Sequence, residues 1–386
     1  MRLAIIVPRY GEHILGGAET QARRFAEAMA QHGWEVEAWT TCAHSHYTWE
    51  NVYPQGSYWS HEVLVRRFPV TQGHQENWIK LESKLSQTGT LTNLEAYEWL
   101  DSGVHSPALY THIAAHASRF DAVIASPYAM PLIHYAAWSA IDQVILWPCL
   151  HDEPYAYLEP TRLLLENARG AMFYSPEEAS LALNRLGIRP RRHAVLGGGV
   201  VLSKGNSLQP QTVKLGSFLL YAGRLEEGKN LSLLYEYVQR YFEQHRTIRL
   251  VVIGQGPLKP PRHPAFIYPG FVSEAEKAAL FHQAVALCQP SLLESFSLTI
   301  MEAWLAGRPV LVHQNCPVTQ GHTQRSRGGL WFQTYEDFAG AVDWLLAHPE
   351  QAAQMGRNGK QYVLANYTWE AVVKRFDKIL RAWGNG

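Results

Sequence analysis

The feature that most restricts the fold of this chain is a repeated alternation of short apolar runs with amphipathic segments of helical length. Near the N-terminus, an apolar run, a helical pattern at about 18–32 and a second apolar run together predict a β-α-β unit. Residues 44–105 then depart from the pattern and are rich in Trp, Tyr, His and Gly, so we expect an irregular insertion that carries substrate-specific loops. The strands predicted in this half cover residues 3–7, 36–41, 122–125, 144–147 and 171–174.

A second series of the same kind begins at residue 218. Residues 197–210, between the two series, are dense in turn-forming residues and indicate a domain boundary. We therefore expect two doubly wound α/β domains. Because such sheets bind ligands at the carboxyl ends of their strands, two facing domains would leave a binding cleft between them. The strands predicted here cover 218–222, 250–253, 285–288 and 309–312, the helices cover 231–241, about 274–282 and about 298–306, and a helical tail from 349 breaks near 366–368.

Composition excludes several classes of protein. Lys plus Arg and Asp plus Glu both number 34, so no net charge draws the chain onto a nucleic acid. The four cysteines form no C-x-x-C pair, which indicates neither a zinc site nor a disulfide framework and fits free thiols in a reducing cytosol. We expect no signal peptide and no membrane span, hence a cytoplasmic protein. The 13 tryptophans suit stacking against sugar rings, although we favour a role in filling apolar walls between domains.

The loop after the strand at 218–222 is a candidate phosphate site. It runs from Gly223 to Asn230 and nearly matches the pattern G-x-x-x-x-G-K-[ST]. Asn230 replaces the hydroxyl that would bind magnesium, and two carboxylates lie inside the loop, so a triphosphate site is disfavoured. Arg224 at the strand end and Lys229 before the next helix would instead suit a diphosphate without a metal. A solvated surface turn explains this loop equally well.

Residues 290–310 carry a more specific pattern. Glu294 lies in a loop after a predicted strand, and Glu302 follows eight positions later inside a predicted helix. Glu294 could bond sugar hydroxyls and Glu302 both hydroxyls of a ribose, while the backbone N–H groups of residues 296–299 would point from the helix start toward an anion. The flanking Pro-Ser and Ala-Gly-x-Pro-Val sequences disfavour the alternative of a capping Glu294 and an exposed Glu302.

This stretch resembles the retaining glycosyltransferases of family 4, which have the GT-B fold and an E-x7-E signature. The resemblance covers essentially the whole chain, is strongest over 218–312 and is weak over 44–120. It implies an acceptor-binding Rossmann-like domain at 1–205 and a donor-binding one at 206–367, with a last helix at about 368–386 packing back on the first domain. The donor-binding residues that it implies are Gly16, Gly17, Gly223, Ser295, Phe296, Ser297, Leu298, Thr299 and Glu302.

Two other segments bear on the same resemblance. His151 follows the strand at 144–147 and matches a position that contacts the transferred sugar in relatives. Asp152 or Glu153 could position an acceptor hydroxyl, but a helix N-cap before Pro154 explains Asp152 equally well. Residues 313–329 replace the usual G-G-x-x-E segment of the family, and His322 and Arg325 could contact donor or acceptor there or lie in a solvated loop.

The resemblance implies transfer of a hexosyl group from a nucleotide diphosphate sugar, with UDP expected first and GDP second, to a glycan or lipid-linked acceptor in surface polysaccharide synthesis. The chain has no D-x-D pair, so we expect no metal and no cofactor, and charge neutralisation must come from the protein. Arg224, Lys229 and the helix start would stabilise the departing diphosphate. His151 and Glu294 would hold the sugar while the acceptor attacks from the same face.

Other functions remain open. The main alternative is a nucleotide-sugar-binding partner subunit that has lost turnover. A P-loop hydrolase would require magnesium, and an oxidoreductase is disfavoured because Gly254-Gln255-Gly256-Pro257 lacks the final glycine of the dinucleotide fingerprint. Peripheral contact with the inner face of a membrane through basic residues such as Arg23 and Arg24 is a further open question, as is the oligomeric state.

Overall fold

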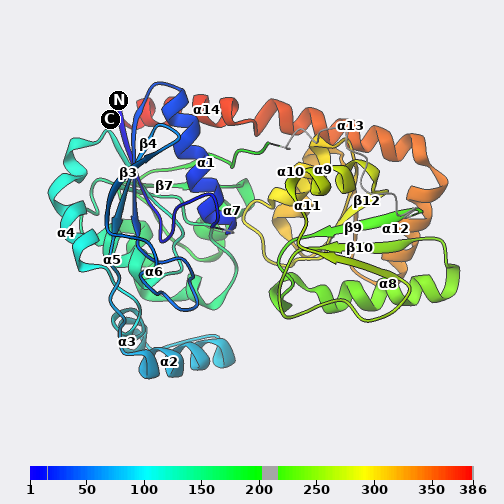
Figure 1. Ribbon diagram of the computed structural model, residues 1–386, viewed down its shortest axis with the longest axis horizontal. Coiled ribbons are helices and arrows are strands. Elements are labelled where there is room, and N and C mark those ends of the chain that lie inside the picture. The colour runs from blue at the N-terminus through cyan, green and yellow to red at the C-terminus, as the bar shows by residue number, and fades with distance from the viewer. Residues whose placement is uncertain (15, 202–215, 385–386) are drawn as a thin grey trace. The chain divides into compact units, whose positions relative to one another are not determined.

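The computed structural model describes residues 1–14, 16–201 and 216–384. The chain forms two compact units, which we call unit 1 (Met1–Gly199 with Trp369–Gly386) and unit 2 (Val200–Thr368), both drawn in Figure 1. The described chain passes from one unit to the other at Gly199, whereas the boundary predicted at 205 and 206 lies outside the described residues.

Unit 1 contains an eight-stranded sheet in the order β3-β4-β2-β1-β5-β6-β7-β8. Every neighbouring pair is parallel except the antiparallel pair β3 and β4. Apart from Arg2 at the start of β1, the central strands are apolar and buried along their length, as strands covered on both faces require. The strands are β1 (Arg2–Ile6), β2 (Glu35–Thr41), β3 (Gly56–Ser60), β4 (Val63–Phe68), β5 (Ala122–Ala125), β6 (Val144–Leu146), β7 (Gly170–Phe173) and β8 (His193–Val195).

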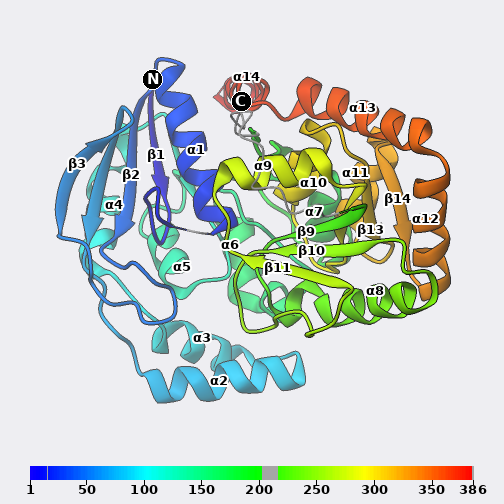
Figure 2. The ribbon, with the colours of Figure 1, turned by 45° about the vertical axis from the view of Figure 1, so that its right-hand side comes forward.

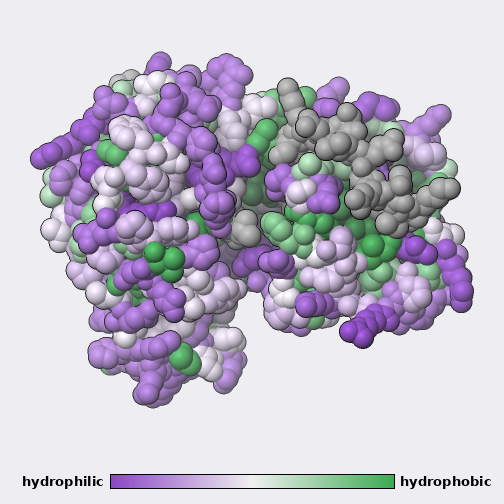
Figure 3. Space-filling view, viewed as in Figure 1, coloured by the Kyte–Doolittle hydropathy of each residue, from purple (hydrophilic) through white to green (hydrophobic). Residues whose placement is uncertain are grey.

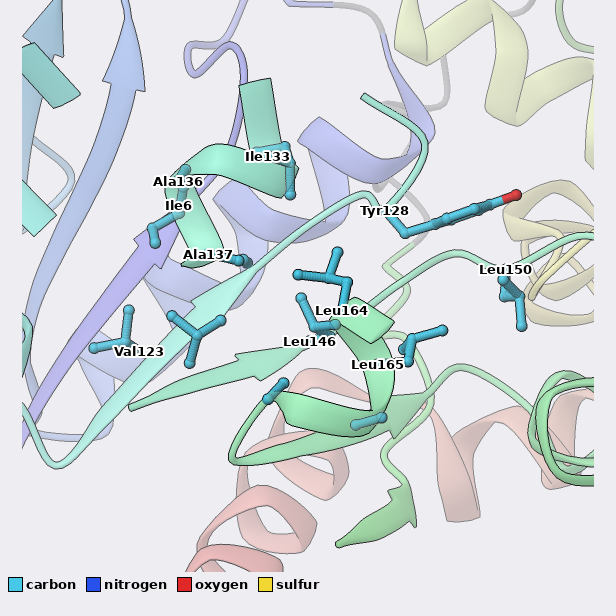
Figure 4. Close-up of a cluster of buried hydrophobic side chains, with 14 of the residues drawn as sticks. Ile6, Val123, Tyr128, Ile133, Ala136, Ala137, Leu146, Leu150, Leu164 and Leu165 are labelled. Carbon is cyan, nitrogen blue, oxygen red and sulfur yellow. The ribbon is translucent and has the colours of Figure 1, made fainter. Parts of the chain in front are cut away.

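Helices cover both faces of this sheet (Figure 2). On one face, Ile133, Leu164 and Leu165 of two helices pack against Val123 and Leu146 of the strands, and Figure 4 shows this core in close-up. Proline in the first turn opens four of the helices, where its missing N–H leaves no hydrogen bond unmade. The helices are α1 (Gly17–Gln31), α2 (Gln75–Thr88), α3 (Asn93–Ser102), α4 (Pro107–His116), α5 (Pro131–Trp138), α6 (Glu159–Asn167), α7 (Pro176–Ser180) and α14 (Trp369–Gly384).

The opposite face is covered by α1 and by the C-terminal helix α14, which lie against each other. Phe25 of α1 and Phe376 of α14 meet edge to face with their ring centroids 5.2 Å apart. Both rings are fully buried, so α14 supplies part of the unit 1 core although it ends the chain.

The prediction of an irregular insertion at 44–105 is wrong. It contains the hairpin β3-β4, which extends the sheet beyond β2, and the helices α2 and α3. A capping box at Thr92 and Glu95 fixes the start of α3. Leu81, Leu85 and Leu100 then form a small apolar core between the two helices.

Unit 2 contains a six-stranded parallel sheet in the order β11-β10-β9-β12-β13-β14. With β9 counted as the first strand, this is the 3-2-1-4-5-6 order of dinucleotide-binding folds. Two of its strands, β11 and β14, were not predicted. The strands are β9 (Phe218–Ala222), β10 (Arg249–Ile253), β11 (Phe266–Gly270), β12 (Ala286–Gln289), β13 (Val310–His313) and β14 (Gly329–Phe332).

The helices of unit 2 also lie on both faces of its sheet (Figure 2). One pair, α8 with α12, closes a core against β9 and β10, while α10 and α11 contact α13. Capping boxes at Ser273 and Thr334 fix the starts of α9 and α12. The helices are α8 (Leu231–His245), α9 (Glu274–Gln283), α10 (Leu298–Leu305), α11 (Pro317–Ser326), α12 (Tyr335–Ala347) and α13 (Pro349–Asn366).

A helix that spans a bilayer needs about 20 consecutive apolar residues, and the described helices include none of that kind. On the face of unit 1 shown in Figure 3, hydrophobic side chains are scattered among hydrophilic ones. Single exposed apolar residues of this kind are normal on a protein surface.

Candidate nucleotide site and associated residues

The strand order of unit 2 reverses between β9 and β12. The chain leaves β9 for α8 on one face of the sheet and leaves β12 for α10 on the other. In open α/β sheets, ligands bind in the crevice outside the carboxyl ends of the strands at this reversal. The loops that carry Arg224 and Lys229, after β9, and Glu294, after β12, both begin there.

An ion pair joins these two loops. Nζ of Lys229 donates to Oε1 of Glu294 at 2.8 Å, and the side chains are 20% and 11% exposed. The amide of Asn230 also spans the crevice, because its Nδ2 donates to the carbonyl of Pro290 at 3.2 Å. Two residues that the sequence placed in separate candidate motifs, 65 positions apart, are thus brought into direct contact.

The loop after β12 is organised by Gln289, the buried last residue of that strand. Its Nε2 lies 3.3 Å from Oε1 of Glu294, 3.2 Å from Oγ of Ser297 and 3.1 Å from Oγ1 of Thr299. Ser297 has a left-handed backbone with φ of 66° and makes no side-chain cap to α10. Sequence reasoning missed Gln289, although an amide at the end of an apolar strand is an available signal.

The residues at the start of α10 that were predicted to bind the donor differ in which of their atoms a ligand can reach. The Phe296 ring is buried between His322 and Tyr367, so only the backbone of this residue can serve a ligand. Ser295, Leu298 and Thr299 are partly exposed. The first turn of an α-helix has N–H groups without partners inside the helix, and these favour an anion.

Gly254 allows the loops after β9 and β10 to meet. Gly254 has φ of +133°, and a Cβ atom there would lie 1.8 Å from the carbonyl oxygen of Gly223. The backbone N–H of Leu225 donates to the carbonyl of Gln255 at 2.9 Å. This close approach fixes the backbone that carries Arg224, whose exposed side chain lies 3.1 Å from Glu226.

Glu302 lies in the second turn of α10 and is held by Lys277 of α9. Nζ of Lys277 donates to Oε1 of Glu302 at 2.7 Å, and the Glu302 side chain is 13% exposed. Burial alone would lower the pKa of Lys277, but the negative charge of Glu302 and this hydrogen bond raise it above its ordinary value. The carboxylate predicted to bind a ribose is therefore already oriented by a cation that sequence reasoning did not find.

In unit 1, His151 is joined to Glu153 and Tyr128. Nδ1 of His151 lies 3.5 Å from Oε1 of Glu153, and the Tyr128 hydroxyl donates to the same oxygen at 2.8 Å. Burial would raise the pKa of Glu153, but the hydrogen bonds from His151 and Tyr128 bring it below its ordinary value. Glu153 therefore orients His151, and the buried Glu178 supports the same segment by accepting from the backbone N–H of Leu150.

Asp152 does not form the helix N-cap that the sequence left open. Its carboxylate lies 3.0 Å from Arg185 and accepts from the Tyr157 hydroxyl at 2.6 Å. The short helix that begins at Pro154 follows Glu153, which makes no side-chain cap either. Asp152 thus links the 151–153 segment to Arg185.

Gly16 and Gly17 lie at the start of α1, with Gly16 as an uncapped, extended N-cap residue. The carboxylate of Glu19 folds back over this helix start, so closely that a Cβ on Gly16 would lie 2.0 Å from it. Glu19 also forms a buried ion pair with Arg9. The helix start therefore already has an anionic neighbour in this structure.

The alternative of a solvated loop at residues 313–329 is wrong, because most of this segment forms the helix α11 and the start of β14. His322 is fully buried, with Nδ1 2.9 Å from the Tyr362 hydroxyl. Burial, aided by the nearby charge of Arg325, lowers the pKa of His322 to about 3, so its ring is neutral. This interior position does not suit direct contact with a donor or acceptor, whereas Arg325 is exposed beside Tyr362.

Within residues 1–14, 16–201 and 216–384, no three His, Cys, Asp or Glu side chains are grouped so as to hold a metal ion. The groups that the loops and helix after β9 and β12 supply are the cations Arg224 and Lys229, the start of α10 and the oriented carboxylates of Glu294 and Glu302. Such a set can bind a phosphorylated ligand and hydroxyl groups next to it.

Comparison with known families supports this interpretation. Residues 209–362 match the family described as Glycosyl transferases group 1. The chain is 21% identical to an uncharacterized glycosyltransferase of Methanocaldococcus jannaschii, over 97% of this chain and 96% of that protein. It is 28% identical to the D-rhamnosyltransferase WbpZ of Pseudomonas aeruginosa over 38% of this chain and 41% of that protein.

Solved structures match across almost the whole chain. Sucrose-phosphate synthase of Thermosynechococcus elongatus aligns with a TM-score of 0.72 and 18% identity over 99% of this chain and 98% of that one. HepE of Anabaena, solved with UDP and glucose, aligns with a TM-score of 0.69 and 14% identity over 99% and 100%. The fold is that of GT-B glycosyltransferases, and the matches together support a GT-B glycosyltransferase.

Proposed function

We propose that this protein is a metal-independent, retaining hexosyltransferase that takes its sugar from a nucleotide diphosphate sugar. The observation that carries the proposal is the Lys229–Glu294 pair, which joins the loops after β9 and β12 at the strand-order reversal of unit 2. That location is where parallel α/β sheets bind nucleotides. The pair combines a cation for a phosphate with a carboxylate for sugar hydroxyls.

In this proposal, unit 2 binds the donor. Arg224, Lys229 and the first turn of α10 neutralise the diphosphate as its bond to the sugar breaks, which is an electrostatic form of catalysis. Glu302, oriented by Lys277, binds the ribose hydroxyls. UDP is the first candidate for the nucleotide because HepE was solved with UDP, and GDP is the second.

Unit 1 supplies the acceptor side of the reaction. His151, oriented by Glu153, contacts the transferred sugar, and the acceptor is a glycan or a lipid-linked saccharide of a surface polysaccharide pathway. The acceptor hydroxyl attacks the anomeric carbon from the face that the diphosphate leaves, and a phosphate oxygen takes the hydroxyl proton. The new glycosidic bond therefore has the configuration of the donor.

The second candidate, a partner subunit that binds a nucleotide sugar without turnover, predicts the same ligand but no reaction. To separate the two, the protein is incubated with UDP-, GDP-, ADP- and TDP-glucose and the corresponding galactose and mannose donors, with a mixture of oligosaccharide acceptors. We expect one donor to release its nucleoside diphosphate at a rate that EDTA does not change. The product is expected to keep the anomeric configuration of the donor, as read from its one-bond C1–H1 coupling.

An inverted anomeric configuration would contradict the retaining mechanism, and a rate abolished by EDTA would contradict metal independence. Binding of a nucleotide sugar with neither transfer nor hydrolysis would favour the partner-subunit alternative. The first two outcomes are read from the reaction itself, and binding without turnover is read from calorimetry with the same donors.

A further inference from the structure

Unit 1 contains a cavity of about 370 Å³ that the residues discussed so far do not line. It lies among the segment after β2, the segment after β4, the helices α2 and α3, the residues that lead into α5, and Tyr155. Most of its lining thus comes from the part of the chain where resemblance to known transferases is weakest. A cavity of this size falls within the range of small-molecule sites.

Aromatic rings dominate the walls. Three indoles, of Trp49, Trp78 and Trp99, and two phenols, of Tyr47 and Tyr155, face this one cavity from separate segments of the chain. Planar rings of this kind offer an apolar face without the flexibility of aliphatic chains.

A carboxylate fixes part of this aromatic wall. Glu82 of α2 accepts a hydrogen bond from Nε1 of Trp99 at 2.8 Å through one oxygen and from the Tyr155 hydroxyl through the other. The two rings lie with their centroids 5.6 Å apart and inclined by 38°. Their orientation is therefore set before any ligand binds, which reduces the entropy lost on binding.

Two glycines bring the segments of the cavity together. A Cβ atom on Gly73 would lie 2.1 Å from the carbonyl oxygen of Gly103, and one on Gly103 would lie 2.5 Å from Pro131. Beside them, the backbone N–H of Thr71 donates to the carbonyl of His105 at 2.8 Å. These contacts give the cavity a defined backbone frame.

We propose that this cavity binds a sugar ring of the acceptor, so that the substrate of unit 1 is a saccharide held by aromatic stacking. The proposal rests on the function proposed above. A pyranose ring has apolar C–H faces that suit the indoles and hydroxyl groups around its edge that suit His46, Gln75 and Ser102 at the cavity lining.

The test uses saturation-transfer NMR on the full chain with methyl glycosides of glucose, galactose, mannose, rhamnose and N-acetylglucosamine, each at millimolar concentration. We expect saturation transfer to at least one glycoside. Tyr47→Ala is the first variant, because Tyr47 is 78% exposed and its loss does not threaten folding. Trp78→Ala is the second, and each is expected to weaken glycoside binding by about tenfold or more.

The matched control is Trp59→Ala, which removes an indole that is 70% exposed on β3 and does not line the cavity. It should bind the glycosides as the wild type does. Saturation transfer to none of the glycosides, equal binding by Tyr47→Ala, or transfer to farnesyl phosphate instead would overturn the proposal. Calorimetry with UDP, GDP, ADP and TDP on the same samples separates the two failures. Binding of one diphosphate without glycoside binding rejects this cavity alone, and binding of neither a diphosphate nor a glycoside rejects the proposed function as well.

Discussion

Replacing Lys229 with alanine is expected to lower kcat/KM for the nucleotide sugar by about 100-fold or more, the effect of removing a group that stabilises developing charge. The substitution removes the ammonium that spans the β9-β12 crevice and leaves the Glu294 carboxylate, which is only 11% exposed, without that cation. Initial rates of nucleoside diphosphate release measure the effect. The departing diphosphate then has fewer cations to stabilise it, so kcat should fall as well as affinity.

The matched control is Lys360→Ala, which removes an exposed lysine from α13 of the same unit. Its rate should equal that of the wild type. A third variant, Lys229→Arg, keeps the charge with a different shape and should retain part of the activity. Wild-type kcat/KM in Lys229→Ala would show that the crevice is not the site of diphosphate departure.

Gly254→Ala is expected to lower the free energy of unfolding by about 3 kcal/mol, because it combines backbone strain with a steric clash. Gly254 has φ of +133°, and the added methyl group would lie 1.8 Å from the carbonyl oxygen of Gly223. The loop after β9 must move to relieve this contact, so UDP affinity should fall as well. Urea unfolding followed by circular dichroism measures the stability, and calorimetry measures the affinity.

Gly340→Ala, in the same unit, is a control substitution that is expected to stabilise the protein. Gly340 is exposed within α12, and a Cβ atom there meets nothing within 4 Å. Alanine at this position should raise the free energy of unfolding by about 0.5 to 1 kcal/mol. If Gly254→Ala were as stable as the wild type, the close approach of the two loops would not be a constraint on the fold.

The alternating units of both domains could be predicted from sequence because each uses a local signal. Apolar runs such as those of β9 and β12 are short and bounded by turn residues, and the helices between them keep an apolar face. The prediction for residues 44–105 failed because β3 is an exposed edge strand without an apolar run. Its partner β4 does alternate buried and partly exposed residues, a period-two signal that was available.

Helix α11 illustrates a second limit of sequence reasoning. The side chains that it buries include Thr319, His322 and Thr323, so it has no apolar stripe by which a helix is recognised. Tertiary packing, here the contacts of α11 with α13 and β13, determines its structure. A solvated loop was considered because this segment is polar, but the structure buries several of these polar side chains.

The candidate site was predictable as two motifs but not as one arrangement. Motif spacing identified Lys229 and Glu294 separately, whereas their contact joins positions 65 residues apart. Gln289 and Lys277, which orient Glu294 and Glu302, belong to no motif and act only through the fold. Such supporting residues are visible only once the strands and helices that carry them are placed.

The most direct test of the central claim, a metal-independent diphosphate site at the β9-β12 crevice, is titration calorimetry with UDP, GDP, ADP and TDP. Each titration is run with and without EDTA, on the wild type and on Arg224→Ala. We predict micromolar binding of one diphosphate that EDTA does not change and that Arg224→Ala weakens by about tenfold, which is 1.4 kcal/mol. Binding of none of the four, binding that requires magnesium, or equal affinity in Arg224→Ala would contradict the account.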